Sequence, residues 1–356
     1  MSGMPHFTFR EIAKHSSEIS HVATPNADWL LYRSKAVLRR VGITGIDPIR
    51  EGITARTYSY LIKRRIEAFN PDIIFAALAS PMIAYLKTEC PIVYFSDATF
   101  ASLVDYYPEF SKLSQWAIRR WNRIEANALR KAKIILLPSQ WAADSAVINY
   151  KIDPAKIFVV PIGANINSPP VVSFESSDWF NVCRLLFVGV EWERKGGDLA
   201  LAVLVELLRR GVRAELHIVG CNPPAGRSHP LMYSYGFLSK TSASKKLADL
   251  FTHATFLIVP SRQEAYGIVF AEASAFGTPS LATRTGGIPS VVQQEVNGFL
   301  FGLDAVASDY ADKICEVWGN QAAYMAVRRS SRQYFLDALN WTVWGDRVEE
   351  IIRRHC

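Results

Sequence analysis

Residues 260–280 read PSRQEAYGIVFAEASAFGTPS, and this stretch indicates more about the fold than any other part of the chain. The apolar run Thr255–Val259 before it predicts a buried strand, which Pro260 ends. A short loop follows, and a helix is expected over Ile268–Phe276, with Gly277 beyond its end. The unpaired N–H groups and the positive dipole end at a helix start suit a phosphate group. The stretch therefore predicts an α/β fold whose strand-to-helix loop binds a phosphorylated ligand.

Two glutamates bracket the predicted helix start. Glu264 lies in the loop and Glu272 lies about two turns into the helix, so the pair can reach two parts of one extended ligand. The alternative is that Glu264 caps the helix and Glu272 is solvated. Because alanines flank Glu272 on an apolar helix, that position is unfavourable for a carboxylate without a partner. The pair therefore favours a binding site.

A second loop upstream has a similar character. Residues 187–198, FVGVEWERKGGD, again lead from a predicted strand through a loop to a predicted helix. Gly189 permits close approach of a ligand to the backbone, and Arg194 with Lys195 can offset the charge on a departing nucleotide diphosphate. An exposed basic loop is the alternative for an isolated Arg-Lys pair. The Arg-Lys pair lies at the carboxyl end of a predicted strand, as the glutamate loop does, and this position favours a role in binding the diphosphate.

Around these loops, short apolar runs alternate with amphipathic stretches, which is typical of parallel strands covered by helices on both faces. A polar, proline-bearing stretch from Asn165 to Asn181 predicts a linker between two doubly wound α/β domains with a cleft between them. In the second half, strands are expected at Leu185–Val190, Glu215–Val219, Thr255–Val259 and Ser280–Ala282, and helices at Asp198–Arg210, Ser244–His253 and Ile268–Phe276. In the first half, strands are expected at Asp72–Ala77, Ile92–Phe95, Ile134–Leu137 and Lys156–Val160, and a helix at Leu113–Arg130.

Composition limits the compartment and the partners. The five cysteines are widely spaced without a CxxC pair, so neither a disulfide framework nor a zinc site is expected. With no signal peptide and no apolar run long enough to span a bilayer, we expect a cytoplasmic protein. The net charge of +7 lies in residues 1–165, with 21 Lys/Arg against 14 Asp/Glu. A basic half can face nucleic acid, anionic lipid or a phosphorylated substrate. Nucleic acid is the weakest option, since the basic residues lack the aromatic interleaving of a recognisable module.

The chain from Pro260 to Phe301 closely resembles the donor-site signature of glycosyltransferase family 4, which has the GT-B fold. In that family the first glutamate of such a pair contacts the donor sugar and the second holds the nucleotide ribose. The resemblance implies these roles for Glu264 and Glu272. It assigns the diphosphate to backbone at the loop and helix start, namely Ala265, Tyr266, Gly267 and Ile268. The family has a similar Arg and Lys-Gly after the earlier strand, which implies the same phosphate contact for Arg194 and Lys195, with Gly189 beside them.

Three further stretches fit the same family. Pro161–Asn165 (PIGAN) is similar to its hinge-side motif, which implies that Gly163 lies near the diphosphate. Tyr235–Ser239 (YGFLS) occupies the place of the loop that cradles the base, which implies base contacts from the backbone of Phe237 and Leu238. Gly286–Pro289 matches a turn beyond the donor sugar. All these stretches occur in family order.

The resemblance implies a GT-B architecture of two Rossmann-like domains facing each other across a cleft. The acceptor-side domain is expected at residues 1–168, the nucleotide-sugar donor domain at 169–339, and a helix crossing back to the first domain at 340–356. The implied activity is retaining transfer from a UDP- or GDP-sugar to a hydroxyl of a glycan, lipid-linked or small-molecule acceptor, in cell-envelope polysaccharide or glycoconjugate synthesis. The acceptor attacks on the face that the nucleotide leaves, and the leaving phosphate takes the proton. No DxD-type metal motif occurs, so neither a metal nor a cofactor is expected.

Asp97 follows the predicted strand Ile92–Phe95 and is the candidate polar residue of the first domain. The family often has a functional residue here that contacts the donor sugar or the acceptor. An Asx turn or a helix N-cap is an equal alternative. His217, His253 and Ser139 are interpreted as structural, with Ser139 as an N-cap.

The N-terminus departs from the family pattern. A helix at Phe7–His15 and a strand at Glu18–Ala23 are expected, without the usual first strand and glycine-rich loop, so the first strand is expected to be missing or displaced. Asp28–Val41 is amphipathic and basic, which makes peripheral association with an anionic membrane a hypothesis beside an ordinary surface helix. The departure leaves two alternative functions open. One is a nucleotide-sugar-binding homologue with impaired catalysis, and the other is a sugar phosphorylase or epimerase on the same fold.

Overall fold

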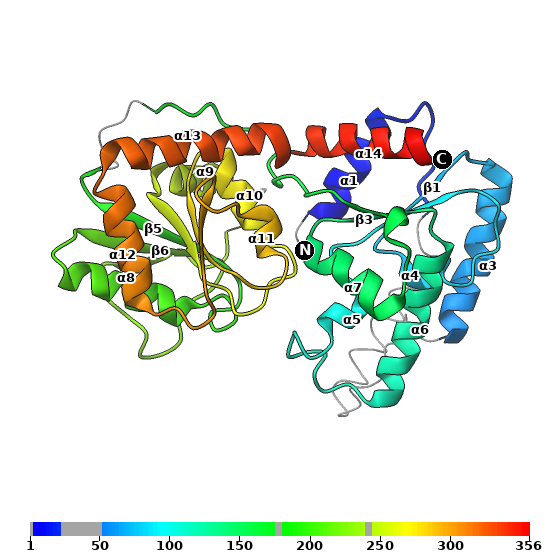
Figure 1. Ribbon diagram of the computed structural model, residues 1–356, viewed down its shortest axis with the longest axis horizontal. Coiled ribbons are helices and arrows are strands. Elements are labelled where there is room, and N and C mark those ends of the chain that lie inside the picture. The colour runs from blue at the N-terminus through cyan, green and yellow to red at the C-terminus, as the bar shows by residue number, and fades with distance from the viewer. Residues whose placement is uncertain (1–2, 23–51, 175–179, 239–243) are drawn as a thin grey trace. The chain divides into compact units, whose positions relative to one another are not determined.

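The computed structural model describes residues 3–22, 52–174, 180–238 and 244–356, which form two compact units (Figure 1). The N-terminal unit contains Gly3–Val160 and Gly345–Cys356, and the C-terminal unit contains Pro161–Trp344. The last helix, α14 (Trp341–His355), therefore contributes its first residues to one unit and the rest to the other. The boundary of the sequence-based domains at residue 168 stays a prediction.

The N-terminal unit is built on a four-stranded parallel sheet in the order β1-β2-β3-β4. β2 and β3 are buried along their whole length, as their continuous apolar sequences require between two helical layers. The strands are β1 (Ile74–Ala77), β2 (Ile92–Phe95), β3 (Ile134–Leu137) and β4 (Ile157–Val159). The helices are α1 (Met4–Lys14), α3 (Gly52–Phe69), α4 (Ser80–Ile83), α5 (Phe100–Leu103), α6 (Gln115–Lys131) and α7 (Gln140–Tyr150), with a short 3₁₀ turn at Pro154–Lys156.

The C-terminal unit has a six-stranded parallel sheet in the order β10-β9-β8-β5-β6-β7. The chain starts in the middle at β5, runs outward to β7, and returns to pair β8 with the other side of β5. The strands are β5 (Cys183–Val188), β6 (Ala214–Val219), β7 (Met232–Ser234), β8 (Phe256–Val259), β9 (Ser280–Thr283) and β10 (Gly298–Phe301). The helices are α8 (Gly197–Arg209), α9 (Ser244–His253), α10 (Ile268–Ala275), α11 (Ile288–Val291), α12 (Ala307–Trp318) and α13 (Gln321–Ala338).

Helix α8 shows how sequence spacing builds the core of the C-terminal unit. Its buried residues Ala200, Val203, Leu204 and Leu207 recur at helical spacing and therefore line one face. That face packs on β5 and β6, whose inward residues belong to the same apolar cluster. Each fully buried Val, Leu or Phe of this kind contributes roughly 1.5–3 kcal/mol of transfer free energy. α12 packs beside α8 and extends the same layer (Figure 1).

Sequence periodicity located most of the elements within two residues, and one expected strand is wrong. Residues 18–22 form no strand, and Ile19 is 39% exposed, because the segment pairs with no edge of the sheet. The expected helix at the N-terminus is confirmed as α1. The amphipathic segment Asp28–Val41 lies outside the described residues.

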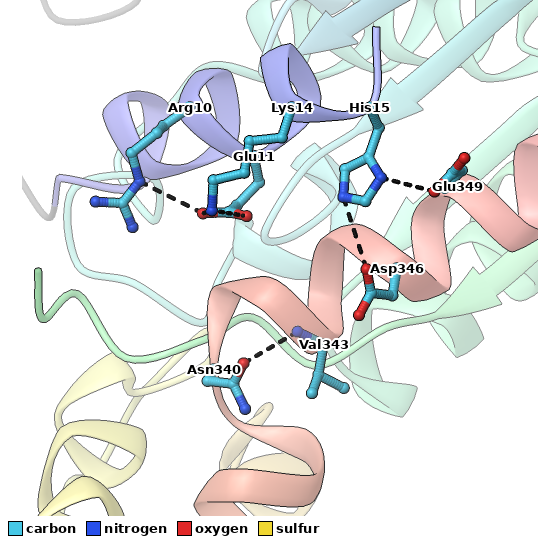
Figure 2. A network of polar contacts seen from close by, with 8 residues as sticks. All are labelled: Arg10, Glu11, Lys14, His15, Asn340, Val343, Asp346 and Glu349. Carbon is cyan, nitrogen blue, oxygen red and sulfur yellow. Dashed lines mark hydrogen bonds and ion pairs between the residues drawn. The ribbon is translucent and has the colours of Figure 1, made fainter. Parts of the chain in front are cut away.

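The two ends of the N-terminal unit meet through α1 and α14, as Figure 2 shows. The Nδ1 atom of His15 lies 2.6 Å from Oε2 of Glu349, and its Nε2 atom lies 3.8 Å from Oδ1 of Asp346. A Cβ at Gly345 would lie 2.8 Å from Nε2 of His15, so a larger residue there would require the imidazole to shift. Asn340 caps the start of α14 by accepting a hydrogen bond from the backbone N–H of Val343 at 3.0 Å.

Candidate functional site

The candidate donor site lies where the strand order of the C-terminal sheet reverses. β5 and β8 are neighbours, although the chain leaves them toward opposite edges of the sheet. The loops that follow them, residues 189–196 and 260–267, therefore emerge side by side at the carboxyl ends of the strands. Ligands of open parallel sheets bind at such a switch point.

Gly196 lets the two loops approach each other closely, and Gly189 makes room for the side chain of Lys195 within its own loop. Gly196 has φ +80°, and a Cβ there would lie 2.2 Å from the carbonyl oxygen of Pro260. A Cβ on Gly189 would lie 2.7 Å from Cγ of Lys195. The backbone N–H of Arg262 donates to the carbonyl of Arg194 at 2.8 Å and joins the two loops. Backbone packing therefore fixes the site before any ligand binds.

The cations of the first loop converge on the first glutamate of the second. Nζ of Lys195 donates a hydrogen bond to Oε2 of Glu264. Nη1 of Arg194 lies 3.7 Å from the same oxygen and donates to the carbonyl of Gln263 at 2.9 Å. These three side chains are only 11–14% exposed, so their charges interact with little solvent screening.

Glu191 orients the guanidinium of Arg194. Nε and Nη2 of Arg194 donate to the two carboxylate oxygens of Glu191 at 3.0 and 2.7 Å, which is the bidentate geometry that suits a planar guanidinium. This hydrogen bonding to Arg194 lowers the pKa of Glu191. The sequence showed only an acid close to the cations, and its pairing with Arg194 needed the structure.

The start of α10 presents backbone rather than side chains. Gly267 is the residue before the helix, with φ +87°, and no side chain caps this end. The Tyr266 side chain is buried and its hydroxyl donates to the carbonyl of Ile162 at 2.9 Å. Burial also raises the pKa of Tyr266. The side chain of Tyr266 is thus buried in the core, and the expected contacts of the backbone at Ala265, Tyr266, Gly267 and Ile268 with a diphosphate stay predictions.

Glu272 lies on α10 and is 4% exposed. It is therefore not the solvated residue that the alternative interpretation required. The carbonyl of Glu264 accepts a hydrogen bond from the backbone N–H of Gly287 at 3.0 Å, so the GG turn supports the glutamate loop directly. The expected roles of the two glutamates toward sugar and ribose stay predictions.

Gly163 has a structural reason for lacking a side chain. A Cβ there would lie 2.3 Å from the backbone nitrogen of Trp341, at the start of α14. The indole N–H of Trp341 donates to Oδ1 of Asn165 at 3.1 Å and fixes the same stretch. The hinge-side motif therefore docks the first turn of α14, and the place of Gly163 beside a diphosphate stays a prediction.

The predicted base loop follows β7 and is held by its neighbours. The carbonyl of Gly236 accepts a hydrogen bond from the N–H of Gly220 at 2.8 Å. Phe237 is 75% exposed and Leu238 is partly exposed, which leaves both accessible to a ligand. Their base contacts stay predictions.

The side chains of Glu215, His217 and Tyr235 form a row of polar contacts next to the predicted base loop, and the sequence did not predict these contacts. Nε2 of His217 lies 3.2 Å from a carboxylate oxygen of Glu215, and Nδ1 lies 2.9 Å from the hydroxyl of Tyr235. Because an ionised carboxylate only accepts, Nε2 carries the proton and Nδ1 accepts from Tyr235. Burial lowers the pKa of His217 and favours this neutral form. The alternation of polar residues on β6 is the only sequence signal that could have indicated these contacts.

Asp97 is the candidate site residue of the N-terminal unit. Asp97 lies between β2 and α5, and the N-cap of α5 is Thr99, whose side chain accepts from the backbone N–H of Ser102. The N-cap alternative for Asp97 is therefore wrong, while the Asx-turn alternative and a part in sugar or acceptor binding both stay predictions. Ser139 is confirmed as the N-cap of α7.

Across the ranges 3–22, 52–174, 180–238 and 244–356, no group of three or more His, Cys, Asp or Glu side chains could hold a metal ion. In the same parts of the chain, no helix is long and apolar enough to cross a membrane.

Family models match both units of the chain. The model described as Glycosyltransferase Family 4 matches residues 11–168, and the model described as Glycosyl transferases group 1 matches residues 183–320. Among curated proteins, D-inositol 3-phosphate glycosyltransferase of Corynebacterium diphtheriae is 25% identical over 203 residues, which is 51% of this chain and 47% of that protein. The protein of the same name from Actinosynnema mirum is 28% identical over 218 residues, covering 54% and 51%. The chain thus spans about half the length of the curated relatives it matches.

Solved glycosyltransferases share the fold. A glycosyltransferase from Rickettsia africae aligns with a TM-score of 0.66 at 16% identity, covering 99% of this chain and 95% of that one. HepE of Anabaena, solved in complex with UDP and glucose, aligns with a TM-score of 0.59 at 17% identity, covering 83% and 80%. The predicted α/β fold of the GT-B type is confirmed by these neighbours.

Proposed function

Because the chain belongs to glycosyltransferase family 4, we propose that it transfers a sugar from a UDP- or GDP-sugar to an acceptor hydroxyl with retention of configuration. The observation that carries this proposal is the convergence of Lys195 and Arg194 on Glu264, beside the start of α10 at the switch point of the sheet. Two cations and a helix N-terminus at one place suit a diphosphate.

Each part of the site has one task in this proposal. Backbone N–H groups around Ala265–Ile268 hold the diphosphate, Glu272 holds the ribose, and Glu264 orients the sugar. Lys195 and Arg194 take over the charge that grows on the leaving phosphate oxygen. Lys195 already contacts Glu264, so donor binding brings a phosphate to a cation that is prearranged and largely shielded from water.

The transfer step follows from these positions. The bond between the anomeric carbon and the phosphate oxygen breaks as the acceptor oxygen bonds to the same face of that carbon. The acceptor proton passes to the leaving phosphate oxygen, so no side chain has to act as a base. A double-displacement route instead needs a carboxylate nucleophile at the anomeric carbon, opposite a second carboxyl group about 5 Å away.

We propose a nucleotide and classes of acceptor for the reaction. HepE was solved with UDP, so UDP is the first nucleotide to test here. The relatives named for D-inositol 3-phosphate make a phosphorylated polyol one acceptor to test beside glycan and lipid-linked acceptors. We place the reaction in cell-envelope polysaccharide or glycoconjugate synthesis in the cytoplasm, without a metal or a cofactor.

A thermal-shift screen against UDP, GDP, ADP and their sugars tests donor binding. A ligand at 100 times its Kd stabilises the folded state by about 2.7 kcal/mol. For a unit of this size, that corresponds to a rise in Tm of about 5–10 °C. The nucleotide that stabilises the protein is then supplied as its sugar with candidate acceptors, and NMR of the product determines the anomeric configuration. Inversion, or stabilisation by none of these nucleotides, contradicts the proposal, whereas binding without turnover supports the binding homologue.

A further inference from the structure

The side chain of Tyr266 joins the loop at residues 260–267, which we call the donor loop, to a connection between the two units. Within the described residues, the chain passes between the units at residues 160–161 and again at residues 344–345. Ile162 follows the first of these crossings, and its carbonyl accepts a hydrogen bond from the hydroxyl of Tyr266 at 2.9 Å. Tyr266 and Ile162 are each only 3% exposed, so water does not compete for this bond.

Residues 161–165, which we call the connecting segment, are held in turn to the start of α14. The backbone N–H of Ala164 donates to the carbonyl of Leu339 at 2.9 Å. The indole N–H of Trp341 donates to Oδ1 of Asn165 at 3.1 Å. Since α14 begins just before the second crossing, these bonds join the two crossings to each other. The hydroxyl of Tyr266 therefore links the donor loop to both.

The donor loop is packed too tightly for Tyr266 to move alone. A Cβ on Gly267 would lie 3.2 Å from Cγ of Glu264 and 2.6 Å from the ring of Phe270. The carbonyl of Glu264 also accepts a hydrogen bond from the N–H of Gly287 at 3.0 Å. A shift of the Tyr266 backbone therefore displaces the Glu264 carboxylate and the start of α10 together, because close-packed groups transmit displacement.

We propose that Tyr266 is a positioning residue for the nucleotide sugar, and that its hydroxyl holds the donor loop in place through Ile162. The inference rests on the proposed function, which assigns the diphosphate to this loop. The buried Tyr266 side chain acts through the backbone on either side of it, since a group fixed in advance binds a ligand at a lower entropic cost. Coupling between sites is reciprocal, so a nucleotide on the donor loop steadies the connecting segment in return.

The test compares Tyr266→Phe with a matched control, Tyr324→Phe, in the full chain. Each substitution removes one hydroxyl that is buried in the C-terminal unit and donates to a backbone carbonyl. The acceptor of Tyr324 is Thr255, at 2.8 Å, which precedes β8 and lies at the opposite end of that strand from the donor loop. Circular dichroism melts verify that both variants fold. Calorimetry with UDP, GDP and ADP measures affinity, and amide hydrogen exchange with and without nucleotide measures local opening.

Tyr266→Phe is expected to bind the nucleotide about 5-fold more weakly than the wild type, the size of effect that one buried neutral hydrogen bond produces. Tyr324→Phe is expected to keep the wild-type Kd. In the wild type, the nucleotide should slow exchange of the N–H of Ala164 in the connecting segment, and this response should be lost in Tyr266→Phe. A role in packing alone lowers Tm and leaves both the affinity and the response unchanged. Wild-type affinity together with a wild-type response in Tyr266→Phe overturns the proposal.

Exchange without nucleotide separates this inference from the proposed function. If the wild type binds none of the three nucleotides, the proposed function fails, and the link through Tyr266 is judged by the free protein. There, Tyr266→Phe should speed exchange of the N–H of Ala164 in the connecting segment and of Gly287, which donates to the donor loop. Tyr324→Phe should speed neither. Faster exchange at only one of the two amides, or at none, shows that the hydroxyl does not link the segments and overturns the inference.

Discussion

Lys195 and Glu264 form an ion pair in a site where both side chains are nearly buried. The sequence predicted that these residues act on one ligand, because each lies in a loop after a strand of the same parallel sheet. It could not predict their direct contact, which depends on Gly196 allowing the two loops to approach and on Gly189 leaving room for the side chain of Lys195. It also missed the pairing of Arg194 with Glu191, since side-chain hydrogen bonds leave no periodic signal.

Lys195→Ala is expected to lower kcat by about 10²–10³-fold, the cost of removing one preorganised group that stabilises transition-state charge. Its Tm should change little, because Arg194 stays beside Glu264. Lys313→Ala is the matched control, as Lys313 lies in the same unit and pairs with Glu316 on α12. Steady-state kinetics measure kcat and a melting curve measures Tm for each variant. Wild-type turnover by Lys195→Ala would remove the role proposed for this residue.

Glu272→Gln is expected to weaken binding of the nucleoside diphosphate by about 10-fold or more, because a hydrogen bond to a charged group contributes about 1.5–3 kcal/mol. The substitution conserves volume at a position that is 4% exposed. Calorimetric titration with the ribonucleotide and its 2′,3′-dideoxy analogue separates ribose contact from a general effect. The variant and the wild type should bind the analogue equally. An equal loss for both nucleotides would show that Glu272 acts on something other than ribose.

At the scale of elements, apolar runs predicted the central strands of both sheets and the edge strands β1 and β4, but they missed the edge strands β7 and β10 of the C-terminal sheet. β2 and β3 begin and end where their sequences indicate, because strands buried on both faces must be continuously apolar. β7 has only three residues and lies at an edge, so its sequence carries almost no signal. The expected strand at Glu18–Ala23 is wrong over its described residues 18–22, because a short segment of alternating apolar residues becomes a strand only when a sheet edge is available to pair with it.

Gly267→Ala is expected to destabilise the protein by about 2–4 kcal/mol, combining an unfavourable left-handed backbone with a steric clash. A Cβ there would lie 2.6 Å from the ring of Phe270. Gly211→Ala is the matched control, because Gly211 has φ +78° but has open space around the added Cβ. Urea denaturation of both variants separates backbone strain from the clash. The start of α10 should shift only in the first variant, so nucleotide affinity should fall there alone. Equal stability of the two variants would contradict this.

At the scale of the whole molecule, the sequence predicted two α/β units. It did not predict how the last helix is divided between them or which helix it contacts. The resemblance placed a helix at the C-terminus, and α14 is present. Its division between the units at Trp344 and Gly345, and its contact with α1 through His15, depend on residues more than 300 positions apart. Local patterns carry no information about such contacts.

The contact between α1 and α14 predicts a pH dependence. The hydrogen bond with His15, followed by that with Arg353, lowers the pKa of Glu349 from its ordinary value of 4.5. This contribution to stability is present above pH 4.5 and is lost as the pH falls through the lowered pKa of the folded state. His15→Ala should therefore be less stable than the wild type at neutral pH, and the difference should shrink in acid. Urea midpoints measured from pH 7 to pH 3 test this, and a difference that grows in acid would contradict it.

The most direct test of the donor site is a crystal structure of the chain with the nucleotide sugar that stabilises it. We predict the diphosphate within hydrogen-bonding distance of the backbone N–H groups at residues 265–267 and of Nζ of Lys195, with the ribose at Glu272. A nucleotide bound elsewhere, with Lys195, Glu264 and Glu272 making no contact to it, would contradict the proposed function.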